Sequence, residues 1–230
     1  MKQKTDDVRA GYADRVYSYL REQIINGNLR PGEKLVESRI AEQLGLSRGP
    51  VRDALKHLAL EGLVDYQTNR GCSVALLSPK DAYEVFFMRG SLEKLALEKS
   101  GCHIDDCGIL IMESALEDMR IASESGNMLD EVSADEKFHR QIVLSCQINR
   151  LYKMWEMLSP LNGAMFLTLK NAKYSAKAEA MGYVSPRLVV PPHREILEII
   201  KTGDLAASCK ALDAHYIKNG ELVYRMSLIE

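Results

Sequence analysis

Four side chains that can ligate a metal ion lie on apolar helical stripes in the second half of the sequence. Asp135 and His139 are four residues apart, so a helix places both on one side. His193 and His215 follow on two later stripes of aliphatic residues. Burying a carboxylate and three imidazoles is unfavourable unless they pair or bind an ion, and this donor set suits zinc, nickel, manganese or iron(II). The residues alone leave two interpretations open: a divalent metal site, or separate hydrogen-bonded histidines in a core.

Arg89 interrupts another apolar stripe, between Phe86 and Leu92. An arginine that faces the interior of a helical bundle can hold the carboxylate of a small acid through two parallel hydrogen bonds. The alternative is an ion pair with Glu93, which lies four residues further on. Without further evidence, the spacing favours the ion pair.

A different chemistry is indicated by the segment Ser47-Arg-Gly-Pro-Val-Arg52, which begins a short amphipathic helix. Ser47 is a favourable N-cap, because its hydroxyl can accept from an amide of the first turn. Pro50 falls in that turn, where its missing N–H costs little. Arg48 and Arg52 lie on another side from the apolar residues. A helix that begins with two arginines can enter a DNA major groove and contact phosphates and guanine edges.

The surrounding elements would position these arginines. A helix over 36–44, a turn at Gly45 and the helix that follows Ser47 form a helix-turn-helix pattern. Strands over 63–67 and 72–76 would form a hairpin, or wing, with Arg70 and Gly71 at its tip. We expect a preceding helix over 13–26 and no regular structure over 1–10. Any pair of amphipathic helices gives a similar pattern, so the pattern alone is not decisive.

The second half of the sequence predicts only helices. Ser78, Pro79 and Asp81 are typical of a helix start, with an N-cap, a proline and an acid in the first turn. Helical patterns follow over about 79–99, 104–124, 128–146, 149–175, 187–201 and 204–227. The sequence therefore predicts a mainly α protein. A winged helix-turn-helix of three helices and a β-hairpin occupies 1–77, and an all-α bundle of about six helices occupies 78–230.

Composition narrows the class of protein. The polar, charged start predicts no secretory signal, and no apolar run is long enough for a membrane span. The five cysteines are scattered without a CxxC pair, so we expect a cytoplasmic protein with neither disulfides nor a cysteine zinc site. Residues 1–77 hold 12 basic and 10 acidic side chains, a net charge of +2 within a chain of −2. So small a positive charge would bind DNA weakly, which favours a dimer that presents two copies.

The run from Leu35 to Leu55, followed by Glu61-Gly-Leu-Val64 and Arg70-Gly71, resembles the winged helix of GntR-type bacterial transcription regulators over residues 12–77. The remaining residues resemble the all-helical ligand-binding domain of the FadR subfamily, called FCD. Arg89, Glu93, the Asp135 and His139 pair, and the two later histidines carry this second resemblance.

The resemblance implies a homodimer that binds a palindromic operator in double-stranded DNA. It also implies a divalent metal ion, with zinc as the first choice, and a small carboxylate effector held by the metal and Arg89. The ligands would be Asp135, His139, His193 and His215. The expected DNA-binding residues are Arg39, Ser47, Arg48, Gly49, Pro50, Arg52, Arg70 and Gly71.

We therefore expect a metabolite-responsive transcription regulator and not an enzyme. Two departures from the family pattern stand in the DNA module: Gly49 occupies a position where threonine is common, and Ser38 one where some members have arginine. Two alternatives stay open, namely a metal-dependent enzyme built on the helical half and a direct metal sensor whose signal is the metal itself.

Overall fold

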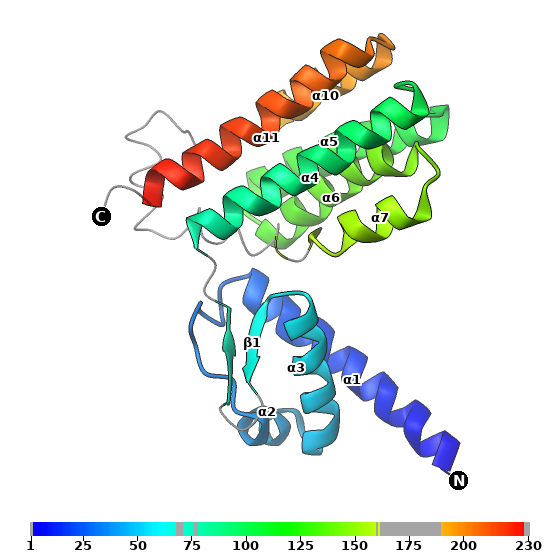
Figure 1. Ribbon diagram of the computed structural model, residues 1–230. Coiled ribbons are helices and arrows are strands. Elements are labelled where there is room, and N and C mark those ends of the chain that lie inside the picture. Colours follow the sequence, from blue (N-terminus) through cyan, green and yellow to red (C-terminus); the bar gives the residue numbers. More distant parts are fainter. Residues whose placement is uncertain (1, 68–70, 76–77, 160, 162–189, 228–230) are drawn as a thin grey trace. The chain divides into compact units, whose positions relative to one another are not determined.

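The computed structural model describes residues 2–67, 71–75, 78–159, 161 and 190–227. The chain divides into two compact units, Met1–Leu77 and Ser78–Glu230 (Figure 1). Helices dominate both units, and two short strands lie in the first. This confirms the predicted mainly α fold with a winged helix-turn-helix followed by a helical bundle. None of the helices described is long and apolar enough to cross a membrane.

The first unit consists of α1 (Lys2–Ile25), α2 (Glu37–Leu44), α3 (Arg48–Leu60) and the antiparallel strands β1 (Val64–Gln67) and β2 (Gly71–Val74). Helix α1 packs against α3, and β1 also packs against α3. The apolar stripe predicted for α3 forms the centre of this core, since its members are at most 1% exposed: Val51, Ala54, Leu55 and Leu58. Burial of this stripe leaves the opposite side of α3 in solvent.

Local geometry explains how α2 and α3 are joined. Gly45 ends α2 in the left-handed conformation, with a φ of 65° that glycine adopts without strain.

The expectation for residues 1–10 was wrong, because α1 begins at Lys2 and not near residue 13. The polar composition of these residues does not prevent a helix from extending beyond its packed part.

The second unit contains α4 (Pro79–Ser100), α5 (Asp106–Ser125), α6 (Met128–Leu144), α7 (Asn149–Glu156), α10 (Val190–Lys201) and α11 (Leu205–Ser227). Helix α4 packs mainly on α11, and α5 on α6. The predicted start of α4 is confirmed as a capping box, in which Ser78 accepts from the Asp81 amide and Asp81 accepts from that of Ser78.

One predicted helix is shorter than expected. The pattern over 149–175 suggested a single helix, but α7 ends at Glu156. Pro160 explains the difference, because a proline ring collides with the helical carbonyl four residues earlier, which here belongs to Glu156. The remainder of that prediction, over 162–175, lies outside the described residues.

Gly90 allows α11 to approach the backbone of α4 closely. A Cβ at this position would lie 2.8 Å from Cδ2 and 3.0 Å from Cγ of Tyr216. These atoms lie at the base of the ring, so the ring could not swing aside without moving α11. The absence of a side chain at position 90 therefore sets where Tyr216 sits.

We expect Gly90→Ala to lower the free energy of unfolding of the helical unit by about 1–3 kcal/mol, the usual cost of overpacking a core. Urea or thermal unfolding measures this. Gly11→Ala in α1 is the matched control, because nothing lies within 4 Å of its added Cβ. A Gly90→Ala protein as stable as the wild type would show that α4 and α11 do not pack this closely.

Candidate DNA-reading helix and metal centre

The N-terminal end of α3 presents one unpaired arginine and an exposed cap. Arg48 is exposed and makes no ion pair with any described residue, and Ser47 beside it is exposed too. Ser47 has the backbone conformation of an N-cap, but its side chain accepts no capping hydrogen bond, so that part of the prediction was wrong. Its hydroxyl therefore does not occupy the first-turn amides of α3. A helix N-terminus with such amides favours anionic groups such as phosphate.

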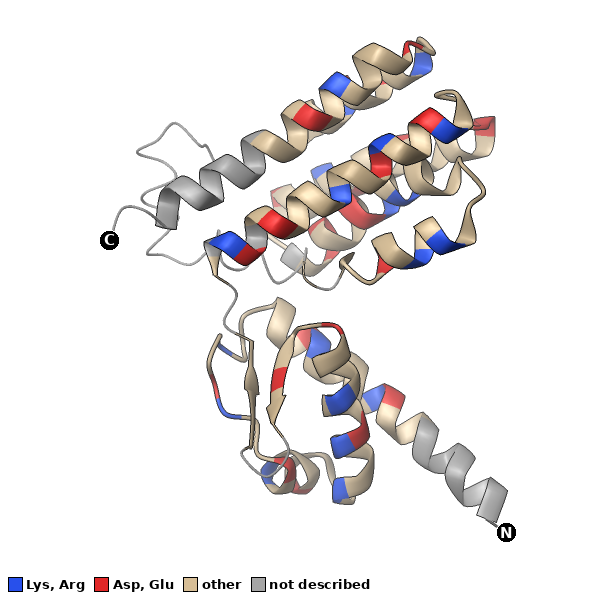
Figure 2. Ribbon diagram, viewed as in Figure 1, with Lys and Arg blue, Asp and Glu red and all other residues tan. Residues whose placement is uncertain are grey.

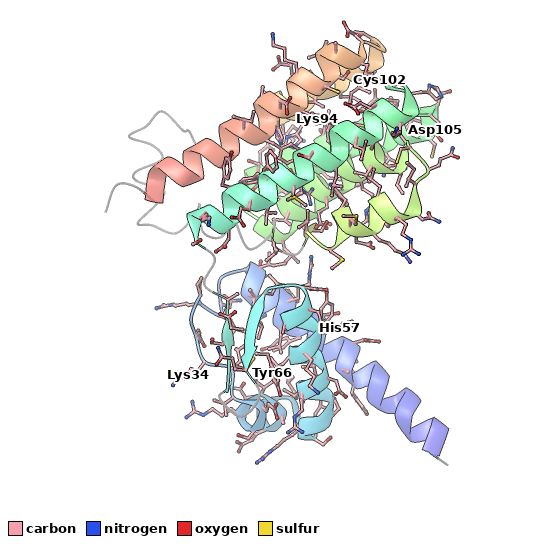
Figure 3. All side chains as sticks on the ribbon, viewed as in Figure 1. Lys34, His57, Tyr66, Lys94, Cys102 and Asp105 are labelled. Atoms are coloured by element: carbon pink, nitrogen blue, oxygen red, sulfur yellow. The ribbon has the colours of Figure 1, made fainter. Side chains whose placement is uncertain are left out.

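Arg52, by contrast, is already held within the unit. Its Nη2 donates to Glu37 of α2 at 2.8 Å, and its Nε lies 3.1 Å from both oxygens of that carboxylate. Tyr66 of β1, labelled in Figure 3, donates to the same carboxylate at 3.2 Å. The Arg52 hydrogen bonds lower the pKa of Glu37 below its ordinary value. One carboxylate thus links α2, α3 and the wing.

The other expected DNA-binding residues are spread over the unit. Basic residues recur along the ribbon of α3 in Figure 2, and Arg39 is exposed on neighbouring α2. Gly49 is half-buried and Pro50 is buried. Gly71 begins β2 in an exposed position, with a φ of 114° that favours glycine, and Arg70 lies outside the described residues. The structure therefore gathers the exposed Arg39, Ser47 and Arg48 on two adjoining helices.

In the second unit, the four predicted metal ligands come from three helices. Asp135 and His139 lie on α6, His193 on α10 and His215 on α11. One ring nitrogen from each histidine lies within 4.8 Å of one from each of the others. Asp135 Oδ1 is 3.1 Å from Nε2 of His193 and 3.7 Å from Nε2 of His139. Asp135, His139 and His193 are at most 5% exposed, so this cluster lies inside the bundle.

Burial and neighbouring charges shift the pKa values of three members of this cluster, and the shifts at Asp135 and His215 favour the metal-binding forms. Burial opposes ionisation of Asp135, but the facing His139 and His193 outweigh it and lower the pKa of the carboxyl. Burial lowers the pKa of His215 well below its ordinary value, and His193 and His139 lower it further. Burial also disfavours a charged His139, but Glu93 and Asp135 outweigh it and raise the pKa of that ring. An anionic Asp135 and a neutral His215 are the forms that bind metals.

The spacing of the donors also fits an ion. Two ligand atoms about 2.1 Å from one metal lie roughly 3.0–3.4 Å apart at octahedral or tetrahedral angles. The Nε2 atoms of His139 and His193 are 3.1 Å apart, as are His193 Nε2 and Asp135 Oδ1. The other separations are wider, 3.7 Å between Asp135 Oδ1 and His139 Nε2 and up to 4.8 Å among the three histidines, so an ion would have to draw these donors inward. A three-His, one-Asp set leaves positions for a further ligand.

The hydrogen-bond partners of Glu93 differ from the one predicted from the sequence. The expected ion pair between Arg89 and Glu93 is not formed, because other donors take both carboxylate oxygens. Oε2 lies 2.7 Å from Nδ1 of His139, whereas Oε1 accepts from Trp155 Nε1 at 2.8 Å and from the Tyr216 hydroxyl at 2.6 Å. The three donors lie on α6, α7 and α11, a convergence that spacing along α4 could not reveal.

Arg89 lies fully buried beside this cluster. Its guanidinium carbon stacks 4.3 Å from the centroid of the Trp155 ring, and its Nη1 donates to the Ser159 hydroxyl at 3.3 Å. Its Nε and Nη2 have no hydrogen-bond partner among the described residues. A buried guanidinium with two unpaired nitrogens, which carry three N–H groups, is costly, so it marks a place where an anionic partner would be stabilised.

Comparison with known proteins identifies the family of both units. Residues 12–74 match the bacterial regulatory proteins of the gntR family, and residues 84–218 match the FCD domain. The solved structure of Escherichia coli McbR/YncC has the same fold, with a TM-score of 0.70 and 22% identity over 93% of this chain and 97% of that one.

Two relatives extend over nearly the whole chain. The HTH-type transcriptional regulator YdhC of Bacillus subtilis is 29% identical over 206 residues, 89% of this chain and 88% of its own length. The gluconate operon transcriptional repressor of Bacillus licheniformis is 27% identical over 209 residues, 90% of this chain and 83% of its own. The FCD match alone spans more than half of the sequence. The chain therefore belongs to the GntR family of DNA-binding bacterial transcription regulators that carry an FCD domain.

Proposed function

We propose that this regulator binds a palindromic operator as a homodimer, with the N-terminal end of α3 as its reading element. The exposed Arg48 and the uncapped start of α3 support this, because both offer donors to phosphates and base edges. A second copy supplies the positive charge that one weakly basic unit lacks. Arg52 contributes mainly by ordering α2, α3 and the wing through Glu37.

We further propose that the helical unit is a sensor of the FadR subfamily type, in which a divalent ion and a small organic acid bind together. Asp135, His139, His193 and His215 would hold the ion, with zinc the first choice for this donor set. The observation that supports an acid ligand is the state of Arg89. Its Nε and Nη2 are buried without a hydrogen-bond partner among the described residues, and its charge acts on Asp135 and His139 of the metal cluster.

The acid would change operator affinity by favouring one arrangement of the dimer over another. A ligand shifts such an equilibrium only as far as it binds the two states differently. The family sets aside the alternative of a metal-dependent enzyme, because its members are transcription regulators. A direct metal sensor remains the competing proposal. Arg89 is evidence against it, because a cation sensor needs no buried guanidinium.

The gluconate operon repressor among the relatives suggests that sugar acids should be among the first ligands tried.

We expect Arg48→Ala to weaken operator binding by about 1–3 kcal/mol, the usual value of a good arginine contact to a base. Gel-shift titration at fixed salt measures this, with thermal unfolding as the check on folding. Arg120→Ala on α5 is the control, since this arginine pairs with Glu117 and Glu124 in the other unit. Unchanged affinity of the Arg48 variant would count against α3 as the reading element.

We expect the double variant His139→Ala, His193→Ala to lose bound metal while still binding the operator. Elemental analysis of the purified protein gives the metal content per chain. His103→Ala is the matched control, because His103 is exposed outside the cluster. Full metal occupancy in the double variant would refute the proposed site.

The wild-type protein loaded with metal tests whether a carboxylic acid binds. We expect carboxylic acids that bind to raise the melting temperature of the wild type, and we expect Arg89→Met to abolish that shift while retaining the metal. Thermal-shift screening of hydroxy acids and sugar acids measures both. If an acid stabilises the variant as much as the wild type, Arg89 does not hold the carboxylate. If operator affinity follows zinc concentration and no acid has any effect, the direct metal sensor is supported instead.

A further inference from the structure

Glu93 occupies an unusual position for a glutamate. It is 0% exposed, lies in the middle of α4 and makes no hydrogen bond to a lysine or an arginine among the described residues. A buried carboxylate is costly unless several donors satisfy its oxygens. Here the donors are one imidazole, one indole and one phenol, so the carboxylate is stabilised by hydrogen bonds from three helices.

The arrangement of these donors is asymmetric. Trp155 Nε1 and the Tyr216 hydroxyl both donate to Oε1, whereas Oε2 faces Nδ1 of His139 at 2.7 Å. An ionised carboxylate only accepts hydrogen bonds. The hydrogen bond to Oε2 therefore requires a proton on Nδ1 of His139.

In the neutral ring that a metal ion requires, that proton decides the state of the other ring nitrogen. A neutral imidazole with its proton on Nδ1 carries a lone pair on Nε2, and Nε2 of His139 is the atom 3.1 Å from Nε2 of His193. This is the ring nitrogen that faces the remaining donors of the metal cluster, including Asp135 Oδ1 at 3.7 Å. A carboxylate behind a ligating histidine both fixes the ring and raises the basicity of the ligating nitrogen.

We infer that Glu93 is the positioning residue of the metal centre: its carboxylate holds the His139 proton on Nδ1 and thereby directs the Nε2 lone pair at the ion. The inference rests on the proposed metal site. Tyr216 strengthens the arrangement, because its hydroxyl also lies 3.3 Å from His139 Nδ1 and its neighbour along α11 is His215. Gly90 permits the ring of Tyr216 to reach this place.

The variant Glu93→Gln tests the inference sharply, because it keeps the size of the side chain and replaces one oxygen by a donor. Trp155 and Tyr216 both need an acceptor, so the amide oxygen stays with them and the NH2 group faces His139. Nδ1 of His139 must then accept, which moves the proton to Nε2 and removes the lone pair from the metal side. We expect roughly 10- to 100-fold weaker zinc binding, the usual effect of replacing a residue that hydrogen-bonds to a metal ligand.

Two measurements decide the outcome. Competition with a chelator gives the zinc affinity, and long-range ¹⁵N–¹H spectra of metal-free, ¹⁵N-histidine-labelled protein show which ring nitrogen of His139 carries the proton. Loss of the corresponding signals in His139→Gln assigns them. Glu113→Gln is the matched control, because that glutamate also links two helices, pairing with Lys201 at the surface, and it should bind zinc like the wild type.

We expect the Nδ1–H form in the wild type and the Nε2–H form in Glu93→Gln, at similar far-UV circular dichroism. Unchanged affinity, an unchanged tautomer, or zinc loss only in proportion to lost helicity would overturn the inference. If Glu93→Gln does not fold, the wild-type spectrum alone decides, since an Nε2–H His139 contradicts the inference and an Nδ1–H His139 supports it. Failure of the wild type to bind any metal would instead refute the proposed metal sensor. Metal binding is measured separately from this spectrum, so the two failures can be told apart.

Discussion

The burial of the Glu93 carboxylate inside a helical bundle constrains the second unit more than any other interaction. Removing such a group from water costs several kcal/mol even after the surroundings relax, so its oxygens must find donors. Glu93 finds them on α6, α7 and α11, and each donor must reach the same point from a different direction. The close packing of α11 on α4 at Gly90 places Tyr216 where its hydroxyl reaches one of these oxygens. The three-histidine cluster is therefore attached to a frame with little freedom to adjust.

The sequence carries the local part of this arrangement and not the long-range part. The spacing of Asp135 and His139 is enough to place both on one side of a helix, and the capping box at Ser78 follows from residue types alone. The hydrogen-bond partners of Glu93 do not follow from residue types or spacing. Arg89 is four residues away and has the opposite charge, yet the partners are 46, 62 and 123 residues distant along the chain. Spacing along one helix cannot weigh such competitors, because they depend on how α6, α7 and α11 pack.

Two arginines show how burial decides the role of one side-chain type. Arg52 is about half exposed and its fork is bound by Glu37, so its charge is largely matched before any ligand arrives. Arg89 is fully buried, and two of its guanidinium nitrogens have no hydrogen-bond partner among the described residues. Residue type indicated ligand binding for both, and only the three-dimensional surroundings separate a structural ion pair from a group prepared for an anion.

The ion pair of Arg52 has a thermodynamic consequence for recognition of DNA. A free arginine gives up as much as about 2 kcal/mol of rotamer entropy when it is fixed in one conformation, and a complex normally bears this cost on association. The bonds to Glu37 immobilise Arg52 during folding of the chain, and Tyr66 holds Glu37 in turn. The entropy of ordering Arg52 is thus lost when the winged helix folds, and Arg52 need not lose it again when DNA binds.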